Sequence, residues 1–196
     1  MTMATTQALR VKSLTGAILS ALLITGLLAV LPLRSSIFAA GAIAMPKCVD
    51  SQLAVTGAAA PGGSLHAGLV IRFRNVSATA CSLTGYSDVV GVNFETGKSR
   101  AAGHVRDGYL GGWMGYKDGK SKPLPLVLLR ARKGEASSMV EWADGATAQQ
   151  PGCTVLTSLW VDTPGGLRPN ALKERMLVCG YFDATPFVPG VTGSAH

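Results

Sequence analysis

The sequence of 196 residues is short of charge: 15% of its residues are charged and 47% are hydrophobic, whereas roughly 25% are charged in an average domain. A chain with little charge and an ordinary hydrophobic fraction is typical neither of disorder nor of a coiled coil. Sustained helical periodicity is also missing, because no stretch keeps a 3.6-residue apolar repeat over three turns. These absences leave one packed, loop-rich domain.

Motifs that would carry catalysis or bind a cofactor are missing as well. The sequence has no H-E-x-x-H zinc helix, no G-x-S-x-G nucleophile elbow and no S-x-x-K motif. Residues 97–99 and 119–121 are both Gly-Lys-Ser, the end of a phosphate-binding loop. However, Val92 and Met114 stand where that loop needs a glycine. We therefore expect no catalytic residue, no cofactor and no metal site.

The N-terminal region has no acidic residue before Asp50, and Arg10 and Lys12 precede an uncharged stretch at residues 14–33. This arrangement is typical of a segment that directs a chain through a membrane. The stretch is longer than a usual signal-peptide core and long enough to span a bilayer, so cleavage and anchoring both stay open. Residues 42–44, Ala-Ile-Ala, fit a cleavage site before Met45. We divide the chain into a signal peptide or transmembrane anchor, residues 1–44, and an exported domain, residues 45–196.

The exported domain has 15 Lys and Arg against 11 Asp and Glu, a net charge of +4. This charge is too mild for a nucleic-acid-binding protein, and we expect no nucleic-acid partner. The expected location is outside the cytoplasm, either secreted or held in the cytoplasmic membrane and facing outward. In the second case residues 14–33 would contact the membrane.

Four cysteines all fall in the exported domain, and an even number in an oxidising compartment predicts two disulfides. There is no C-x-x-C pair, and spacings of 33, 72 and 26 residues match no zinc ribbon or finger. Three connectivities are possible, of which the two short closures are the simplest. These two closures would join Cys48 to Cys81 and Cys153 to Cys179.

Short segments with alternating apolar residues, separated by turn residues, predict an all-β fold. In residues 65–73, for example, apolar residues occupy every second position, while Arg72 and then Arg74 fall on the other face. We therefore expect that face of the strand to be exposed to solvent. Seven to nine strands in about 150 residues predict an immunoglobulin-like two-sheet sandwich with Trp142 and Trp160 in its core. The expected strands lie at residues 53–55, 65–73, 81–83, 88–94, 126–129, 136–142, 155–161 and 175–182.

Two segments resemble an exported actinobacterial family, the domain of unknown function 4232. The first is Phe73-x-Asn75 followed by Cys81-x-Leu83-x-Gly85-Tyr86, similar to the family's F-x-N and C-x-L-x-G-Y motifs. The second is a hairpin motif carried by Gly134, Ala136, Val140 and Trp142. Ser87 departs from the pattern, since the family usually has proline there. The resemblance covers residues 48 to about 189. It implies a secreted or membrane-tethered β-sandwich with paired cysteines and no assigned activity.

Charge is concentrated in one region of the sequence. From Lys98 to Lys133 there are nine basic and two acidic residues, a charge of +7, while the rest of the exported domain carries −3. Residues 98–125 also interleave glycines with aromatic residues, which predicts a mobile basic loop. Exposed aromatic side chains beside cations suit an anionic envelope polymer, a lipid headgroup or a protein partner. The candidate binding residues are Arg106, Tyr109, Trp113, Tyr116, Lys117, Lys120 and Lys122.

The alternative for the aromatic residues of this loop is that they fold back and cap the open end of the sandwich. Three functions consequently stay open. The first and favoured one is an exported, non-enzymatic cell-envelope module that binds through the basic loop. The second is an envelope enzyme with a loop-borne site near His104, and the third is a membrane-anchored structural component.

Overall fold

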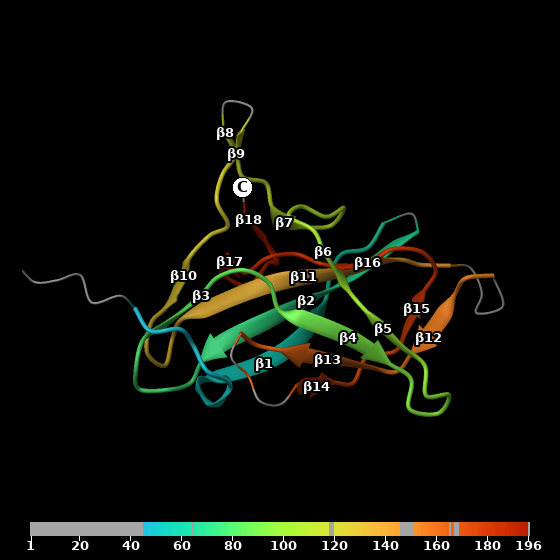
Figure 1. Ribbon diagram of the computed structural model, residues 1–196, viewed down its shortest axis with the longest axis horizontal. Coiled ribbons are helices and arrows are strands. Elements are labelled where there is room, and N and C mark those ends of the chain that lie inside the picture. The colour runs from blue at the N-terminus through green and yellow to red at the C-terminus, as the bar shows by residue number, and fades with distance from the viewer. Residues whose placement is uncertain are drawn as a thin grey trace, which may run out of the picture. The chain divides into compact units, whose positions relative to one another are not determined.

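The computed structural model describes residues 45–63, 65–117, 120–145, 151–164, 166 and 169–195 (Figure 1). The predicted signal peptide or anchor, residues 1–44, lies outside the described residues. None of the described segments forms a helix that is long and apolar enough to cross a membrane.

Two larger sheets form the framework of the domain. The first has the order β1-β2-β11-β16-β6, and β17 also pairs with β11. The second has the order β14-β13-β4-β5. The first sheet consists of β1 (Leu53–Ala59), β2 (His66–Asn75), β11 (Glu135–Ala143), β16 (Phe182–Ala184), β6 (Gly103–His104) and β17 (Val188–Pro189). The second consists of β14 (Asn170–Leu172), β13 (Ser158–Asp162), β4 (Asp88–Val92) and β5 (Ser99–Ala101).

In the described part of the chain, four further short strand pairs are present, and one 3-10 helix, η1 (Asp50–Gln52), precedes β1. Most pairings are antiparallel, whereas β16 with β6 and β18 with β7 are parallel. The short pairs are β3 (Cys81–Leu83) with β10 (Val127–Leu129), β12 (Thr154–Leu156) with β15 (Met176–Val178), β7 (Gly112–Trp113) with β18 (Ser194–Ala195), and β8 (Tyr116–Lys117) with β9 (Lys120–Ser121). The predicted all-β sandwich is confirmed.

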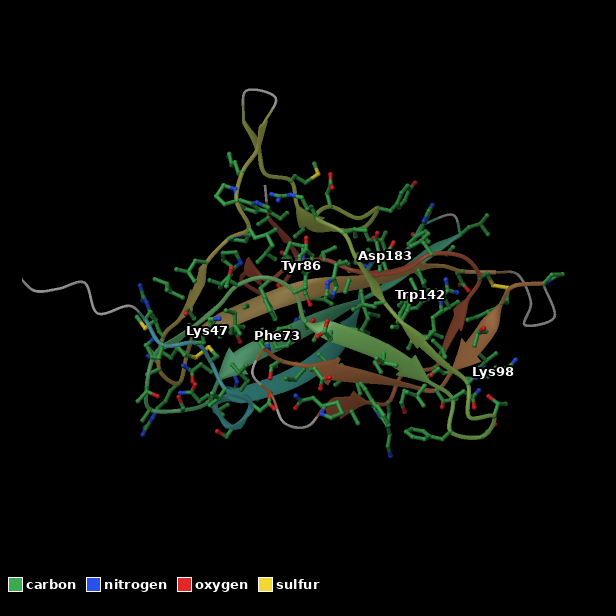
Figure 2. The ribbon with its side chains drawn as sticks, viewed as in Figure 1. Lys47, Phe73, Tyr86, Lys98, Trp142 and Asp183 are labelled. Carbon is green, nitrogen blue, oxygen red and sulfur yellow. A yellow bond between two sulfur atoms is a disulfide. The ribbon has the colours of Figure 1, made fainter. Side chains whose placement is uncertain are left out.

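One hydrophobic core contains residues from both sheets. Phe73 on β2 packs edge-on against Phe187, with ring centroids 5.0 Å apart, and Val161 on β13 is fully buried in the same cluster. Trp142 on β11 also belongs to it, as predicted (Figure 2). Arg72 and Arg74 are exposed, which confirms the wet face at this end of β2. Period-2 alternation thus places the apolar side chains on the inner face.

Both predicted disulfides are present: Cys48 is bonded to Cys81 and Cys153 to Cys179. The first joins the segment before η1 to β3, and both of its cysteines are buried. The second joins residues next to β12 and β15, and both of its cysteines are half-buried. The short closures are therefore the correct connectivity.

The prediction that Trp160 is a core residue is wrong. Its side chain is 38% exposed, whereas its neighbours Leu159 and Val161 are fully buried. Residues 155–161 were expected to form one strand, but Thr157 separates β12 from β13, and these strands belong to different sheets. In β13 the alternation places Leu159 and Val161 inward, so Trp160 must point outward. The size of the indole ring does not change this register.

The expected strand at residues 175–182 is divided in the same way. It contains β15, which pairs with β12, and the first residue of β16, which pairs with β11. In both cases the hydrophobic pattern is continuous while the hydrogen-bonding partner changes. The periodicity of a single strand does not contain this information, since it reports only which face is buried.

Residues 98–125 do not form the predicted loop of little secondary structure. They contain β5 to β9, and β5 and β6 extend the two main sheets. We call residues 98–125 the insertion. Part of it covers the outer face of β11, where Met139 is 2% and Glu141 3% exposed. The inner face of β11 packs in the core, so this strand is buried on both sides.

Candidate functional site

The nine basic residues between Lys98 and Lys133 lie in three separate parts of the fold. Lys98 and Arg100 belong to the β4–β5 hairpin, and Figure 2 shows Lys98 far from the hairpin formed by β8 and β9. Residues 130–133 form the turn between β10 and β11 and contribute three exposed cations. The region from Lys98 to Lys133 is therefore not one continuous basic surface.

The remaining four cations, Arg106, Lys117, Lys120 and Lys122, lie at or beside the β8–β9 hairpin, which we call the basic hairpin (residues 116–122). Its backbone pairs Tyr116 with Ser121 and Lys117 with Lys120. In Figure 1 it extends away from both main sheets. Three of the predicted lysines are thus brought together on one projecting element.

Two of the predicted binding residues hold the base of this hairpin. The Arg106 guanidinium donates a hydrogen bond to the backbone carbonyl of Lys122. The Trp113 indole Nε1–H donates one of 3.2 Å to the carbonyl of Pro123. Trp113 is half-buried and is not part of the core cluster. Arg106 and Trp113 therefore position the hairpin, and Trp113 does not cap the core.

Tyr109 lies apart from the hairpin contacts. Its side chain is 69% exposed, and its ring stacks on His66 with centroids 3.6 Å apart and an interplanar angle of 11°. The Nδ1 atom of His66 is 2.6 Å from the hydroxyl of Tyr181. The seven candidate residues therefore belong to two different places.

A groove of about 400 Å³ lies beside this stack. Burial is the main cause that raises the pKa of Tyr181, and the charges of Glu141 and Asp183 raise it further. Two carboxylates therefore lie close enough to the Tyr181 hydroxyl to act on it. Its lining consists of His66, Val105, Asp107, Gly108, Tyr109, Glu141, Tyr181 and Asp183.

Glu141 connects the groove to the insertion. One carboxylate oxygen accepts a hydrogen bond of 2.8 Å from the backbone N–H of Tyr109, and the other accepts one of 2.7 Å from Leu110. Gly108 also lies against this carboxylate, since an added Cβ would be 2.1 Å from Glu141 Oε1. The buried charge of Glu141 is thus compensated by two N–H groups at this turn.

His104, the centre of the alternative enzyme site, lies elsewhere. Its Nε2 atom is 3.3 Å from Asp88 Oδ1, with side chains 39% and 77% exposed, and its ring stacks on Tyr86 at 4.5 Å. His104 does not line the groove that contains Asp107. Within the described ranges, no group of three or more His, Cys, Asp and Glu is arranged to hold a metal ion.

The groove was not expected from the sequence. Its lining comes from β2, β11, β16 and the insertion, which are far apart in the chain. Glu141 stands between the core residues Val140 and Trp142, so the alternation of β11 places it on the outer face, where residues 98–125 cover it. This alternation was the available signal, but it did not identify the partners of the carboxylate.

These features define a small all-β domain with one core and two disulfides. The chain belongs to the family described as a domain of unknown function, DUF4232, whose model matches residues 48–188. No curated protein matches the chain, and no solved structure does.

The residues that carried the family resemblance have structural roles. Phe73 packs in the core, and the buried Asn75 side chain donates 2.8 Å and 3.2 Å hydrogen bonds to the carbonyls of Thr79 and Leu129. Gly85 has a φ of +85°, which favours glycine. Gly134 is required sterically, because a Cβ there would be 2.4 Å from Leu129 Cα. These motif residues thus belong to the framework of the fold.

Proposed function

We propose that this chain is an exported, non-enzymatic binding module of the cell envelope, and that its basic hairpin contacts an anionic partner. The single observation that carries the proposal is the projection of the hairpin bearing Lys117, Lys120 and Lys122 away from the two main sheets (Figure 1). A projecting hairpin can approach an extended surface without rearrangement of the core.

The charge and anchoring of the hairpin support this function. Residues 116–122 contain three lysines and one aspartate, and Arg106 adds a further positive charge at the base. Each basic residue close to an anionic membrane surface contributes about 1 kcal/mol to binding. Because the base is held by Arg106 and Trp113, little ordering free energy is needed when a partner binds.

Two observations support the export of the domain. The sequence before Met45 has the pattern of a targeting segment, and both disulfides suit an oxidising compartment outside the cytoplasm. Secretion and anchoring differ in the fate of residues 14–33. Mass spectrometry of the mature N-terminus distinguishes them, because cleavage would leave Met45 as the first residue.

The test is a charge reversal with a matched control. The variant Lys117→Glu/Lys120→Glu/Lys122→Glu changes the hairpin, and Arg130→Glu/Arg132→Glu/Lys133→Glu changes the exposed β10–β11 turn by the same net charge. We expect only the hairpin variant to lose low-salt binding to vesicles of anionic phospholipid or to an immobilised polyanion. Binding of the parent should weaken as salt shortens the Debye length from about 10 Å at 0.1 M to about 3 Å at 1 M.

Equal losses in both variants would show that net charge alone drives the binding and would reject the hairpin as its site. Unchanged binding of the hairpin variant would reject the proposal altogether. Thermal melting of both variants checks that the fold is intact. The two arms also separate the source of the negative charge, since a lipid headgroup predicts binding to vesicles and a polymer predicts binding to the polyanion.

A further inference from the structure

The groove beside Tyr109 has the size and construction of a small-ligand site. Its volume of about 400 Å³ falls in the range of ligand pockets, roughly 300–1,000 Å³. Three strands of the first sheet contribute to it: His66 from β2, Glu141 from β11 and Asp183 from β16. The insertion contributes Asp107 and Tyr109. A ligand would thus contact a rigid sheet and an anchored turn.

The charges of the lining exclude an anionic ligand. Among the described residues, three carboxylates line the groove and no lysine or arginine does. Glu141 is compensated by the N–H groups of Tyr109 and Leu110. In the described part of the chain, the side chains of Asp107 and Asp183 make no ion pair and no side-chain hydrogen bond. Two carboxylates therefore remain available to a cation that enters the groove.

The aromatic residues provide a second independent element. One face of the Tyr109 ring is covered by His66, and the side chain is still 69% exposed. An organic cation within about 6 Å of such a ring face is attracted by the ring quadrupole. The hydrogen bonds from the backbone at residues 109 and 110 to Glu141 hold the ring in place before a ligand arrives, which lowers the entropic cost of binding.

We propose that this groove binds an organic ammonium group, with the exposed face of Tyr109 and the carboxylates of Asp107 and Asp183 as its contacts. The site is separate from the basic hairpin and goes beyond the proposed function, because the hairpin selects negative charge and the groove selects positive charge. The pKa of Tyr181 is raised first by burial and then by the charges of Glu141 and Asp183, which also line the groove.

The probe is glucosamine, with glucose as its neutral counterpart, because both have the same ring and differ in the ammonium group. In an NMR titration at constant ionic strength, glucosamine should produce saturable shifts of the Tyr109 and Tyr181 ring signals, and glucose should not. Tetramethylammonium, which cannot donate a hydrogen bond, should also bind if the aromatic face contributes. Equal binding of glucose would overturn the proposal, since it would indicate stacking of a sugar without recognition of charge.

Variants test the contacts. Asp183→Asn should weaken glucosamine binding about tenfold, as expected when one charge-assisted contact is lost, and Tyr109→Ala should weaken tetramethylammonium binding. Glu95→Gln and Phe94→Ala remove the same groups from the exposed β4–β5 turn and should change nothing. If Asp183→Asn does not fold, Asp107→Asn, at an exposed position, takes its place.

Unchanged binding in every groove variant would overturn the proposal and assign the shifts to another surface. The anionic-vesicle binding of Asp183→Asn, measured in parallel, should equal that of the parent. This second measurement separates the two proposals. If the hairpin does not bind an anionic partner, the parent will not bind the vesicles, but the glucosamine titration will be unaffected.

Discussion

The carboxylate of Glu141, on the outer face of β11, accepts a hydrogen bond of 2.8 Å from the backbone N–H of Tyr109 in the insertion. This contact joins residues separated by 32 positions in the chain. It places the Tyr109 ring on His66 and closes one side of the groove. A single buried acid thus connects the sheet to the segment that carries the candidate binding residues.

Replacing Glu141 with glutamine should loosen this turn. The amide has only one acceptor for two N–H donors, and a hydrogen bond to a charged group contributes about 1.5–3 kcal/mol. We expect a loss of about that size in the free energy of unfolding, together with faster hydrogen exchange at the amides of Tyr109 and Leu110. Glu135→Gln, on the same strand but exposed, is the control. Unchanged exchange at both amides would contradict the proposed anchoring role.

The two tryptophans of the sandwich should respond differently to truncation. Trp142 is 8% exposed and belongs to the core cluster, while Trp160 is 38% exposed and contacts the exposed Phe94. Trp142→Ala should lower the free energy of unfolding by about 3–5 kcal/mol, as for other large core truncations. Trp160→Ala should cost less than half as much. Urea denaturation measures both, and equal losses would show that the outer face of β13 is covered.

The two disulfides should differ in their sensitivity to reductant. Both stabilise the fold by constraining the unfolded chain, by roughly 3–4 kcal/mol each. Cys48 and Cys81 are 1% and 0% exposed, whereas Cys153 and Cys179 are half-buried. Because thiolate attack needs access to the sulfur, Cys153–Cys179 should be reduced first. Alkylation and peptide mapping during reduction give the order. Earlier reduction of Cys48–Cys81 would indicate that its end of the sandwich opens locally.

Asp162 is expected to lower the stability of the domain at neutral pH. Burial is the main cause that raises its pKa above the ordinary value of 3.8, and the charges of Asp88 and Asp50 add to the effect. Asp162 lies directly opposite Asp88 in the β13–β4 register. The folded chain therefore holds this proton more tightly than the unfolded chain. The resulting stability is fully present below pH 3.8 and is lost as the pH rises through the raised pKa.

Asp162→Asn should accordingly raise the melting temperature at pH 7. The difference from the parent should shrink as the pH falls below 3.8, where the carboxyl group is protonated in both states. Glu95→Gln, in an exposed turn, serves as the charge-matched control. A variant that melts lower than the parent at pH 7 would contradict the prediction.

Several features of this fold could be predicted because they depend on local patterns. The alternation along residues 71–75 predicts which side chains at this end of β2 are buried, since successive residues in a strand face opposite sides. Val70, on the outer face, is also buried. The same rule identifies Trp142 as a core residue. The same rule places Trp160 on the outer face of β13, because Leu159 and Val161 on either side of it point inward.

The pairing of strands was beyond such patterns. Thr157 separates two strands that continue one hydrophobic run but pair with β15 and β4. Which strands pair depends on the total area that the whole sandwich buries, and the pattern of a single segment does not report that area. The separation of the basic residues into three parts of the fold also depends on strand pairing, because the insertion folds into several short strands instead of one loop.

By itself, the sequence determined the all-β class and the buried face of the long strands, because each depends on spacing within short segments. It favoured the two short disulfide closures, and the structure selected them among the three connectivities. Only the tertiary structure decided that Lys117, Lys120 and Lys122 share a projecting hairpin and that Tyr109 meets His66 beside a groove. For the groove, the physical reason is that its contacts join β2, β11, β16 and the insertion. Side chains from such distant segments become neighbours only when the complete core is packed.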